Sequence, residues 1–357
     1  MAEAVHILRS DLTKTERQSQ PAPALGPGSV LLRVESFAVT ANNVTYAVMG
    51  EGFGYWNFFP APEGRGIVPM WGHAVVEASE HPDIAVGERV YGYLPMASHV
   101  RIEPGNISKG SFSDMAAHRQ PMSPVYNQYR RLDGDPTHDP AREAQRMIFQ
   151  PLFGTSFLIE AMFAKENWFG ADTLVMTSAS SKTSLALAHV ARAKAPQIRR
   201  IGLTSAGNTD FVTKSGLYDE VLSYDEIGTL AGRNAVSVDF AGNAAVLRAI
   251  HEALGDGLKY SCLVGATHVD ARGQSSAPLP GPAPILFFAP DHMNAAVKEM
   301  GFDAFTASYN GAWRDFLVST DDFMTVDERH GLGEAEAAFL STLKGGAAPD
   351  QGIVIRL

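Results

Sequence analysis

Hydrophobic and polar positions follow two different patterns along the chain. Between residues 28 and 120, short β-enriched runs are separated by glycines and prolines; the runs include GSVLLRVESFAV, AVGERVYGYL and HVRIEP. Runs of this kind, broken by turn residues, predict short strands joined by tight turns. The first part of the chain is therefore expected to form a small antiparallel β-domain. The polar stretch 130–145, which carries two prolines, is expected to be a linker or surface loop.

From about residue 151 the pattern changes to apolar runs that alternate with helical stretches. Strands are predicted at TLVMTS, RRIGLTS, DEVLSY, AVSVDFAG and YSCLVGAT, and helices are predicted from Thr183 and Asn243. This alternation predicts a parallel, doubly wound sheet with its ligand crevice at the carboxyl ends of the strands. After a Pro-rich break at 275–284, two helix-like segments precede a terminal strand, GIVIRL. The predicted fold class is α/β.

Composition narrows the class of protein. The 357 residues are 45% hydrophobic and 19% charged, which is typical of a globular protein of about two domains. The net charge of −10 gives no field that attracts nucleic acid or an anionic membrane, and neither is an expected partner.

Cysteine content and hydropathy indicate the compartment. Cys262 is the only cysteine, which excludes an intramolecular disulfide and any zinc site that needs two thiolates. We expect no apolar stretch of the roughly eighteen residues that a bilayer span requires. The charged N-terminus carries no recognisable targeting signal. A cytoplasmic location is expected.

Several short segments, taken in order, resemble one known family. They are GPGSVLLRVESFAVTANN, VGERVYG, LFGTSFLIEAMF, SGLYDEVLSYDE, VDFAGN, LVGAT and the closing GIVIRL. Together they resemble the medium-chain dehydrogenase/reductase superfamily, and its zinc-free quinone oxidoreductase and enoyl reductase branch in particular. The resemblance covers most of the chain, although the loops at 52–66 and 120–148 match poorly.

The resemblance implies a domain organisation. It places the N-terminal part of a GroES-like catalytic domain at 1–150 and a Rossmann nucleotide-binding domain at 151–284. Residues 285–357 would return to complete the edge of the Rossmann sheet and then the catalytic domain. Family members commonly pair these sheets edge to edge, which implies a homodimer, here formed through PAPILFFAP.

The segment SASSKTS follows the first predicted strand of the parallel sheet. In the family this loop usually reads GASGGVG, and its three key glycines fall on Ser178, Ser181 and Ser184. Serine is small and adds a hydroxyl donor, and amides at a helix N-terminus attract phosphate. The hydroxyls of these three serines and the ammonium of Lys182 would strengthen that attraction. The loop is therefore interpreted as an altered phosphate cradle, with contacts expected at Ser178, Ala179, Ser180, Ser181, Lys182 and Thr183.

Two other interpretations of this loop stay open. The serines are also typical of a helix N-cap, with Lys182 in solvent. Lys182-Thr183 after a strand also resembles the end of a P-loop, although Met176 and Ser181 replace both of its glycines.

The second strand of the parallel sheet bears on the choice of dinucleotide. NAD usually requires a carboxylate near the end of this strand, but IGLTSAGN offers Thr204, Ser205 and Asn208, with no acid before Asp210. These groups, with Arg200 and Lys214 nearby, favour NADP(H), although a plain surface turn fits them as well. The resemblance implies further cofactor contacts at Thr155, Gly242, Gly265, Ala266 and Thr267.

In the zinc-free branch an asparagine and a tyrosine of the catalytic domain often line the nicotinamide pocket. Asn42 and Tyr46 match that constellation, and Tyr55 in an aromatic loop is a second phenol. A phenol can donate a proton to developing negative charge, although packing is the more common explanation for either tyrosine. His73 lies in a segment that resembles a zinc motif, but no cysteine lies near it, and no metal is expected.

The sequence thus predicts a zinc-independent, NADP(H)-dependent oxidoreductase. It would move hydride to or from a small molecule with an activated C=C or carbonyl group, such as an enone, an enoyl ester or a quinone. The alternative is a non-catalytic binding or scaffold protein that keeps the fold and has lost the cofactor.

Overall fold

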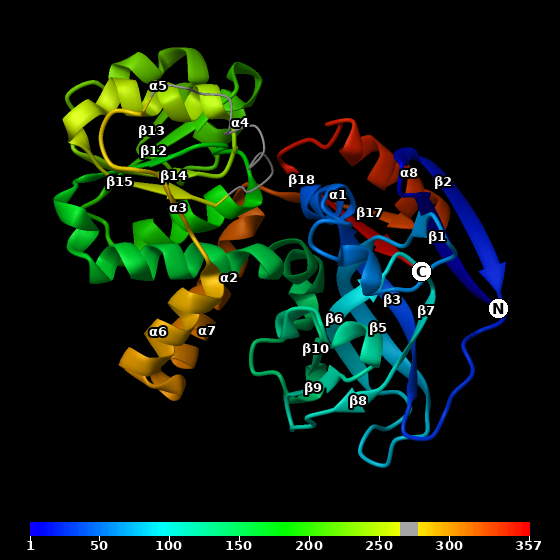
Figure 1. Cartoon of the computed structure of the whole chain (residues 1–357). Coiled ribbons are helices and arrows are strands. Elements are labelled where there is room, and N and C mark those ends of the chain that lie inside the picture. The colour runs from blue at the N-terminus through cyan, green and yellow to red at the C-terminus, as the bar shows by residue number, and fades with distance from the viewer. Residues whose placement is uncertain (265–277) are drawn as a thin grey trace. The chain divides into compact units, whose positions relative to one another are not determined.

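The computed structural model describes residues 1–264 and 278–357 (Figure 1). The chain divides into two compact units. Unit 1 comprises Met1–Ile148 and Met324–Leu357, and unit 2 comprises Phe149–Phe323. Unit 1 is thus built from both ends of the chain, and unit 2 is inserted between them.

Unit 2 contains a six-stranded sheet in the order β13-β12-β11-β14-β15-β16. Every neighbouring pair in it is parallel. In chain order the strands are β11 (Thr173–Met176), β12 (Arg199–Thr204), β13 (Glu220–Ser223), β14 (Ala235–Asp239), β15 (Leu258–Leu263) and β16 (Ile285–Leu286). This spatial order is the dinucleotide-binding order 3-2-1-4-5-6, which places a ligand crevice at the carboxyl ends of β11 and β14. The predicted parallel sheet is confirmed.

Helices accompany this sheet. They are α2 (Glu143–Lys165), α3 (Lys182–Lys194), α4 (Thr209–Lys214), α5 (Ala244–Leu254), α6 (Ala289–Met300) and α7 (Phe302–Ser319). An aromatic seam joins α2 to α7, since Phe153 lies 5.1 Å from Trp313 and 5.3 Å from Phe316 between ring centroids. All three rings are fully buried, so this seam forms part of the core of unit 2.

One helical stretch corrects the expectation about membrane spans. Pro140–Lys165 is long and apolar enough to cross a bilayer by length and composition, and 61% of its most apolar window is buried inside the protein. The stretch was missed because polar residues interrupt its apolar positions along the sequence. Its apolar rings pack against other parts of the chain, as those of a core helix do.

Unit 1 is built mainly from antiparallel strands. Its larger sheet has the order β17-β18-β3-β5-β6-β10-β9-β8, with β7 paired to β3, and a smaller sheet has the order β2-β1-β4. The strands are β1 (Ala2–Leu8), β2 (Asp11–Gln20), β3 (Val30–Val39), β4 (Arg65–Gly66), β5 (Pro69–Ser79), β6 (Arg89–Pro95), β7 (His99–Ile102), β8 (Pro104–Gly105), β9 (Ser111–Asp114), β10 (Gln128–Arg131), β17 (Thr325–His330) and β18 (Gln351–Arg356). Two helices, α1 (Ala41–Val48) and α8 (Leu332–Leu343), complete it. The predicted β-rich part is confirmed.

The C-terminal strand shows how the ends of the chain are joined. β18 pairs antiparallel with β3, so that Val354 lies opposite Ala38. The polar stretch 130–145 belongs to unit 1 and is not a free linker for most of its length. Thr137 is 4% exposed, and the buried Asp135 carboxylate is ion-paired with Arg146.

Candidate functional site

The SASSKTS loop connects β11 to α3 at the carboxyl edge of the parallel sheet. β11 ends at Met176 and α3 begins at Lys182. Ser181 is the N-cap of α3, because its Oγ accepts the N–H of Ser184 at 3.3 Å. The predicted strand, turn and helix are thus present, and the hydroxyl of Ser181 stabilises the first turn of the helix.

Ser178 has the backbone conformation that glycine favours. Its φ is 47°, in the left-handed region, which costs an L-residue roughly 1–2 kcal/mol. Two hydrogen bonds hold it there. Its N–H donates to the Tyr224 hydroxyl at 3.0 Å, and its carbonyl accepts from the N–H of Ser181 at 2.7 Å. The serine thus takes a glycine conformation, and neighbouring groups offset the cost.

Ser184 does not present its hydroxyl to a ligand. The residue is fully buried, and its Oγ lies 2.9 Å from the hydroxyl of Tyr218. The expectation that all three serines would attract phosphate through their hydroxyls is therefore wrong at this position. The reason is helical geometry, which turns the third residue of α3 towards the core.

The structure brings several predicted cofactor residues together. Asn208 donates from Nδ2 to Ser180 Oγ at 3.1 Å, and Thr204 Oγ1 lies 3.5 Å from the same oxygen. Ser205 follows Thr204 and is exposed. Ser180 therefore links the loop to the end of β12. Lys214 is exposed at the far end of α4 and lies apart from this group in the sequence.

Arg200 does not belong to this group, which corrects the expectation that it lies near the second strand's end. It lies at the amino end of β12, four residues and about 13 Å from Thr204 at the rise of a strand. Its guanidinium donates to Asp219 at 2.8 Å and to the carbonyl of Leu217 at 3.2 Å. These bonds hold it at the edge of the sheet opposite the crevice.

The end of β14 contains a carboxylate that the sequence interpretation did not select. Asp239 is buried, and its Oδ1 accepts from Thr177 Oγ1 at 2.8 Å and from the N–H of Gly242 at 3.2 Å. Gly242 has a φ of 64°, so this turn also uses the left-handed region. Asp239 thus fixes the turn that carries Gly242 beside the carboxyl end of β11. The sequence feature that could have identified Asp239 is its place at the end of the apolar strand in VDFAGN.

Of the remaining predicted cofactor positions, the structure describes Thr155 but not residues 265–267. Thr155 is half-buried on α2, next to Ser156, whose hydroxyl donates to the carbonyl of Thr183 at 2.8 Å. Gly265, Ala266 and Thr267 lie outside the described residues.

In unit 1 the three residues predicted for chemistry lie together. Tyr46 on α1 and Tyr55 in the short helix η1 (Tyr55–Asn57) have ring centroids 4.8 Å apart. Burial raises the pKa of the Tyr46 hydroxyl above its ordinary value, and hydrogen bonds with Trp71 and Asn42 partly oppose this shift. The Trp71 indole donates to the Tyr46 hydroxyl at 3.1 Å. The neighbouring Asn43 is instead structural, because its side chain accepts from the N–H of Thr40 and donates to the carbonyl of Pro69.

Tyr126 is a further member of this group, and the sequence interpretation missed it. Its hydroxyl lies 3.2 Å from that of Tyr55, and its ring lies 4.8 Å from the ring of Tyr93. Desolvation raises the pKa of Tyr126 far above its ordinary value, so the phenol keeps its proton. It comes from the segment 120–148, where the family resemblance is poorest. No local pattern marks it.

His73 is buried in β5 and neutral. It has no exposed surface, and among the described residues neither ring nitrogen has a hydrogen-bond partner. Burial lowers its pKa to about 3. In residues 1–264 and 278–357, no group of three or more His, Cys, Asp or Glu side chains is arranged to hold a metal ion. The ring is thus a core side chain in this structure.

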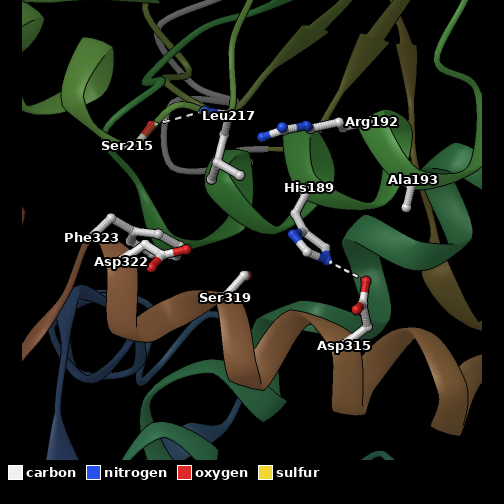
Figure 2. A pocket seen from close by; sticks show the side chains of 9 residues that line it. All are labelled: His189, Arg192, Ala193, Ser215, Leu217, Asp315, Ser319, Asp322 and Phe323. Atoms are coloured by element: carbon white, nitrogen blue, oxygen red, sulfur yellow. Dashed lines mark hydrogen bonds and ion pairs between the residues drawn. The ribbon is translucent and has the colours of Figure 1, made fainter.

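A separate pocket of unit 2 lies between α3 and α7 (Figure 2). Its volume is about 290 Å³, and its lining includes His189, Arg192, Asp315 and Asp322. Figure 2 shows the His189 ring facing Asp315, with Nε2 3.1 Å from the carboxylate. None of its lining residues belongs to the predicted cofactor or substrate positions, so this pocket is separate from the predicted cofactor site.

Comparison with known families gives one match across most of the chain. Residues 37–348 match the model of DUF2855, which is described as a protein of unknown function. The chain belongs to this family. No curated protein matches the sequence.

This DUF2855 member is similar in structure to several reductases. It superimposes on CurA from Vibrio vulnificus in complex with NADPH with a TM-score of 0.63 and 14% identity, over 99% of this chain and 98% of that one. A quinone oxidoreductase from Thermus thermophilus, solved also with NADPH, gives 0.59 and 17%, over 99% and 100%. A mutant enoyl thioester reductase from Candida tropicalis gives 0.58 and 11%, over 100% and 99%. The fold that the resemblance implied is confirmed.

Proposed function

We propose that this protein is an NADP(H)-dependent oxidoreductase that needs no metal ion. The observation that carries this proposal is the SASSKTS loop. Although it lacks glycine, Ser178 adopts the left-handed conformation at φ 47° and the loop leads into the N-terminus of α3. Amides and the dipole at such a terminus stabilise a pyrophosphate. Proteins of the same fold are known with NADPH.

The choice of NADP(H) over NAD(H) rests on the end of β12. Thr204, Ser205 and Asn208 supply hydroxyl and amide groups and no carboxylate. A carboxylate there would bind a free ribose and repel a 2′-phosphate. Neutral hydroxyl and amide groups can donate hydrogen bonds to the 2′-phosphate, so the oxidised and reduced forms of NADP are the proposed cofactors.

The tyrosines of unit 1 support the proposed reaction type. Tyr55 and Tyr126 form a hydroxyl pair among aromatic rings, because the Tyr55 ring also lies near the rings of Tyr46, Phe53 and Phe58. A phenol that stays protonated can hydrogen-bond a substrate oxygen and donate its proton as negative charge develops. This setting suits flat, uncharged acceptors, and we propose enones, enoyl esters or quinones as the substrate class. The nicotinamide would supply or accept the hydride when bound.

Metal independence rests on the chemistry of His73. It is the residue whose segment resembles a zinc motif, and its ring is buried with a pKa of about 3. It lies within the core beside the ring of Tyr91, at 5.3 Å between centroids. We therefore propose that tyrosine hydroxyls do the work that zinc does in related dehydrogenases.

We also propose a homodimer and a cytoplasmic location. β16 is the last strand of the parallel sheet, and its Ile285 and Leu286 are 50% and 53% exposed. An exposed apolar edge strand favours pairing with a second sheet. The only cysteine, Cys262, is buried and forms no disulfide, which fits a reducing compartment.

One observation favours the non-catalytic alternative. The N–H of Ser178 donates to the Tyr224 hydroxyl, and the N–H groups of Ala179 and Ser181 donate to the carbonyls of Leu203 and Ser178, so several donors of the loop are satisfied within the protein. If the other donors are satisfied in the same way, the fold would persist without a cofactor.

Introducing a negative charge into the loop separates these two functions. Ser180→Glu places a carboxylate at the centre of the loop, and Gln197→Glu adds the same charge in an exposed turn at the amino edge of the sheet. We expect Ser180→Glu to weaken NADPH binding by at least tenfold through repulsion between like charges, and Gln197→Glu to leave it unchanged. Equal NADPH affinity in both variants, with both folded, would mean that the loop binds no pyrophosphate.

A further inference from the structure

Tyr218 connects three parts of unit 2 beneath the SASSKTS loop. Its ring lies against β12, where a Cβ atom added to Gly202 would come within 2.8 Å of both Tyr218 Cδ1 and Ala179 Cβ. Its hydroxyl lies 2.8 Å from the carbonyl oxygen of Ala179 and 2.9 Å from Ser184 Oγ. One phenol thus contacts the second strand, the loop and the first turn of α3.

The direction of these hydrogen bonds follows from the chemistry of the groups. Burial raises the pKa of Tyr218 above its ordinary value, so the phenol keeps its single proton. The carbonyl of Ala179 can only accept, so this proton is donated to it. The hydroxyl of Ser184 then donates to the phenol oxygen. The result is a directed chain from Ser184 through Tyr218 to Ala179.

This chain orients the peptide bond between Ala179 and Ser180. No peptide bond among the described residues is cis, and in a trans peptide the C=O and N–H groups point in opposite directions. A carbonyl of Ala179 held towards Tyr218 therefore turns the N–H of Ser180 away from it. Ser180 is half-buried, and its hydroxyl contacts Asn208 in the short helix η7 (Ala206–Asn208) that follows β12. An outward N–H at the start of a helix is the donor that phosphate sites use.

We propose that Tyr218 is a positioning residue for the pyrophosphate of the dinucleotide. It holds the Ala179–Ser180 peptide in the orientation that binds phosphate, a task that backbone freedom performs in glycine loops. The proposal rests on the proposed function of the same loop. It also gives a reason for Ser184, whose buried hydroxyl acts through Tyr218 and does not contact the ligand.

Tyr218→Phe tests this role, because it removes the hydroxyl and keeps the ring against Gly202. Tyr260→Phe is the matched control. Tyr260 lies on β15 of the same sheet, and its ring stacks on Phe169 at 4.5 Å. The measurements are the dissociation constants of NADPH and of adenosine 2′-monophosphate, with thermal unfolding of the nucleotide-free proteins. Adenosine 2′-monophosphate lacks the pyrophosphate and reports on general damage to unit 2.

We expect Tyr218→Phe to weaken NADPH binding about tenfold, the effect of one well-placed hydrogen bond, and to leave the affinity for adenosine 2′-monophosphate unchanged. Tyr260→Phe should bind both ligands as the wild type does. Equal losses for both ligands in Tyr218→Phe would assign Tyr218 a structural role and overturn the proposal, and so would unchanged NADPH binding. A wild-type protein that binds no NADPH would overturn the proposed function itself, and the role of Tyr218 with it.

Discussion

The hydroxyl of Tyr55 lies 3.2 Å from the hydroxyl of Tyr126, although 71 positions separate the two residues in the sequence. Tyr55 comes from an aromatic loop after α1, and Tyr126 comes from the short helix η3 (Pro124–Tyr126). Their rings meet edge to face at 5.8 Å. Two phenols in contact give unit 1 a donor and an acceptor side by side, which is what stabilising a substrate oxygen requires.

Removing either hydroxyl should slow hydride transfer. We expect Tyr55→Phe and Tyr126→Phe each to lower kcat for a quinone or enone acceptor by about 10–100-fold, with the dissociation constant of NADPH unchanged. The double variant should lose little more than the worse single variant, because contacting groups act as a unit. Steady-state kinetics with fluorescence titration measure both quantities. Full activity in the double variant would remove these tyrosines from the mechanism.

The tyrosine pair shows which residues of the candidate site the sequence predicts and which it does not. Asn42 and Tyr46 were predicted because they match a family constellation, and Tyr55 was predicted because it is a phenol in a nearby aromatic loop. Tyr126 lies in a Pro-rich stretch with no periodicity, and only tertiary packing brings it to Tyr55. A contact between distant segments leaves no local trace in a single sequence.

Unit 2 shows the same limit of sequence-based prediction. The strand and helix around SASSKTS were predicted, since apolar runs and a serine cap have local signatures. Arg200 was placed wrongly because proximity in sequence does not tell the amino end of a strand from its carboxyl end. Ser184 was placed wrongly because three similar serines point to different sides once a helix begins. Tyr218 and Tyr224, which lie just before and just after β13, hold the loop through their side chains, and no motif predicts such contacts.

The end of β12 should determine cofactor preference. Ser205→Asp would place a carboxylate at the exposed position after Thr204. We expect NADPH to bind at least tenfold more weakly and NADH to bind more tightly, because a carboxylate repels the 2′-phosphate and accepts the free ribose hydroxyls. Titration of both nucleotides at one salt concentration measures the ratio, and Ser205→Asn serves as the uncharged control. An unchanged ratio of the two affinities would show that the adenosine ribose binds elsewhere.

A buried ion pair should dominate the stability of unit 1. Arg119 and Asp114 are 1% and 2% exposed at their side chains and lie 2.8 Å apart. Asp114→Ala leaves the Arg119 charge buried without its partner, and should lower the free energy of unfolding by about 3–5 kcal/mol. Glu103→Ala breaks the exposed pair with Arg101, and should cost less than about 1 kcal/mol. Urea unfolding compares the two variants, and similar losses would contradict the assignment.

His73 should make the protein sensitive to acid. Burial lowers its pKa from 6.5 to about 3, so between these values the unfolded state binds a proton that the folded state does not. The free energy of unfolding therefore falls as the pH drops from 6.5 towards 3, by up to about 1.4 kcal/mol per pH unit from this residue. His73→Leu cannot bind that proton, and its stability should fall less steeply in urea unfolding across this range. Identical slopes for the two proteins would show that His73 is already charged in the folded state.

The central claim is that a loop without glycine binds a dinucleotide, and a titration of the purified protein with NADPH and NADH tests it most directly. Nicotinamide fluorescence and calorimetry at one fixed salt concentration give both dissociation constants. The account predicts saturable binding of one NADPH per chain, at least tenfold tighter than that of NADH. No binding of either nucleotide by the folded protein would contradict the account. The SASSKTS loop would then be only a serine-capped helix start that is hydrogen-bonded to Tyr218 and Tyr224.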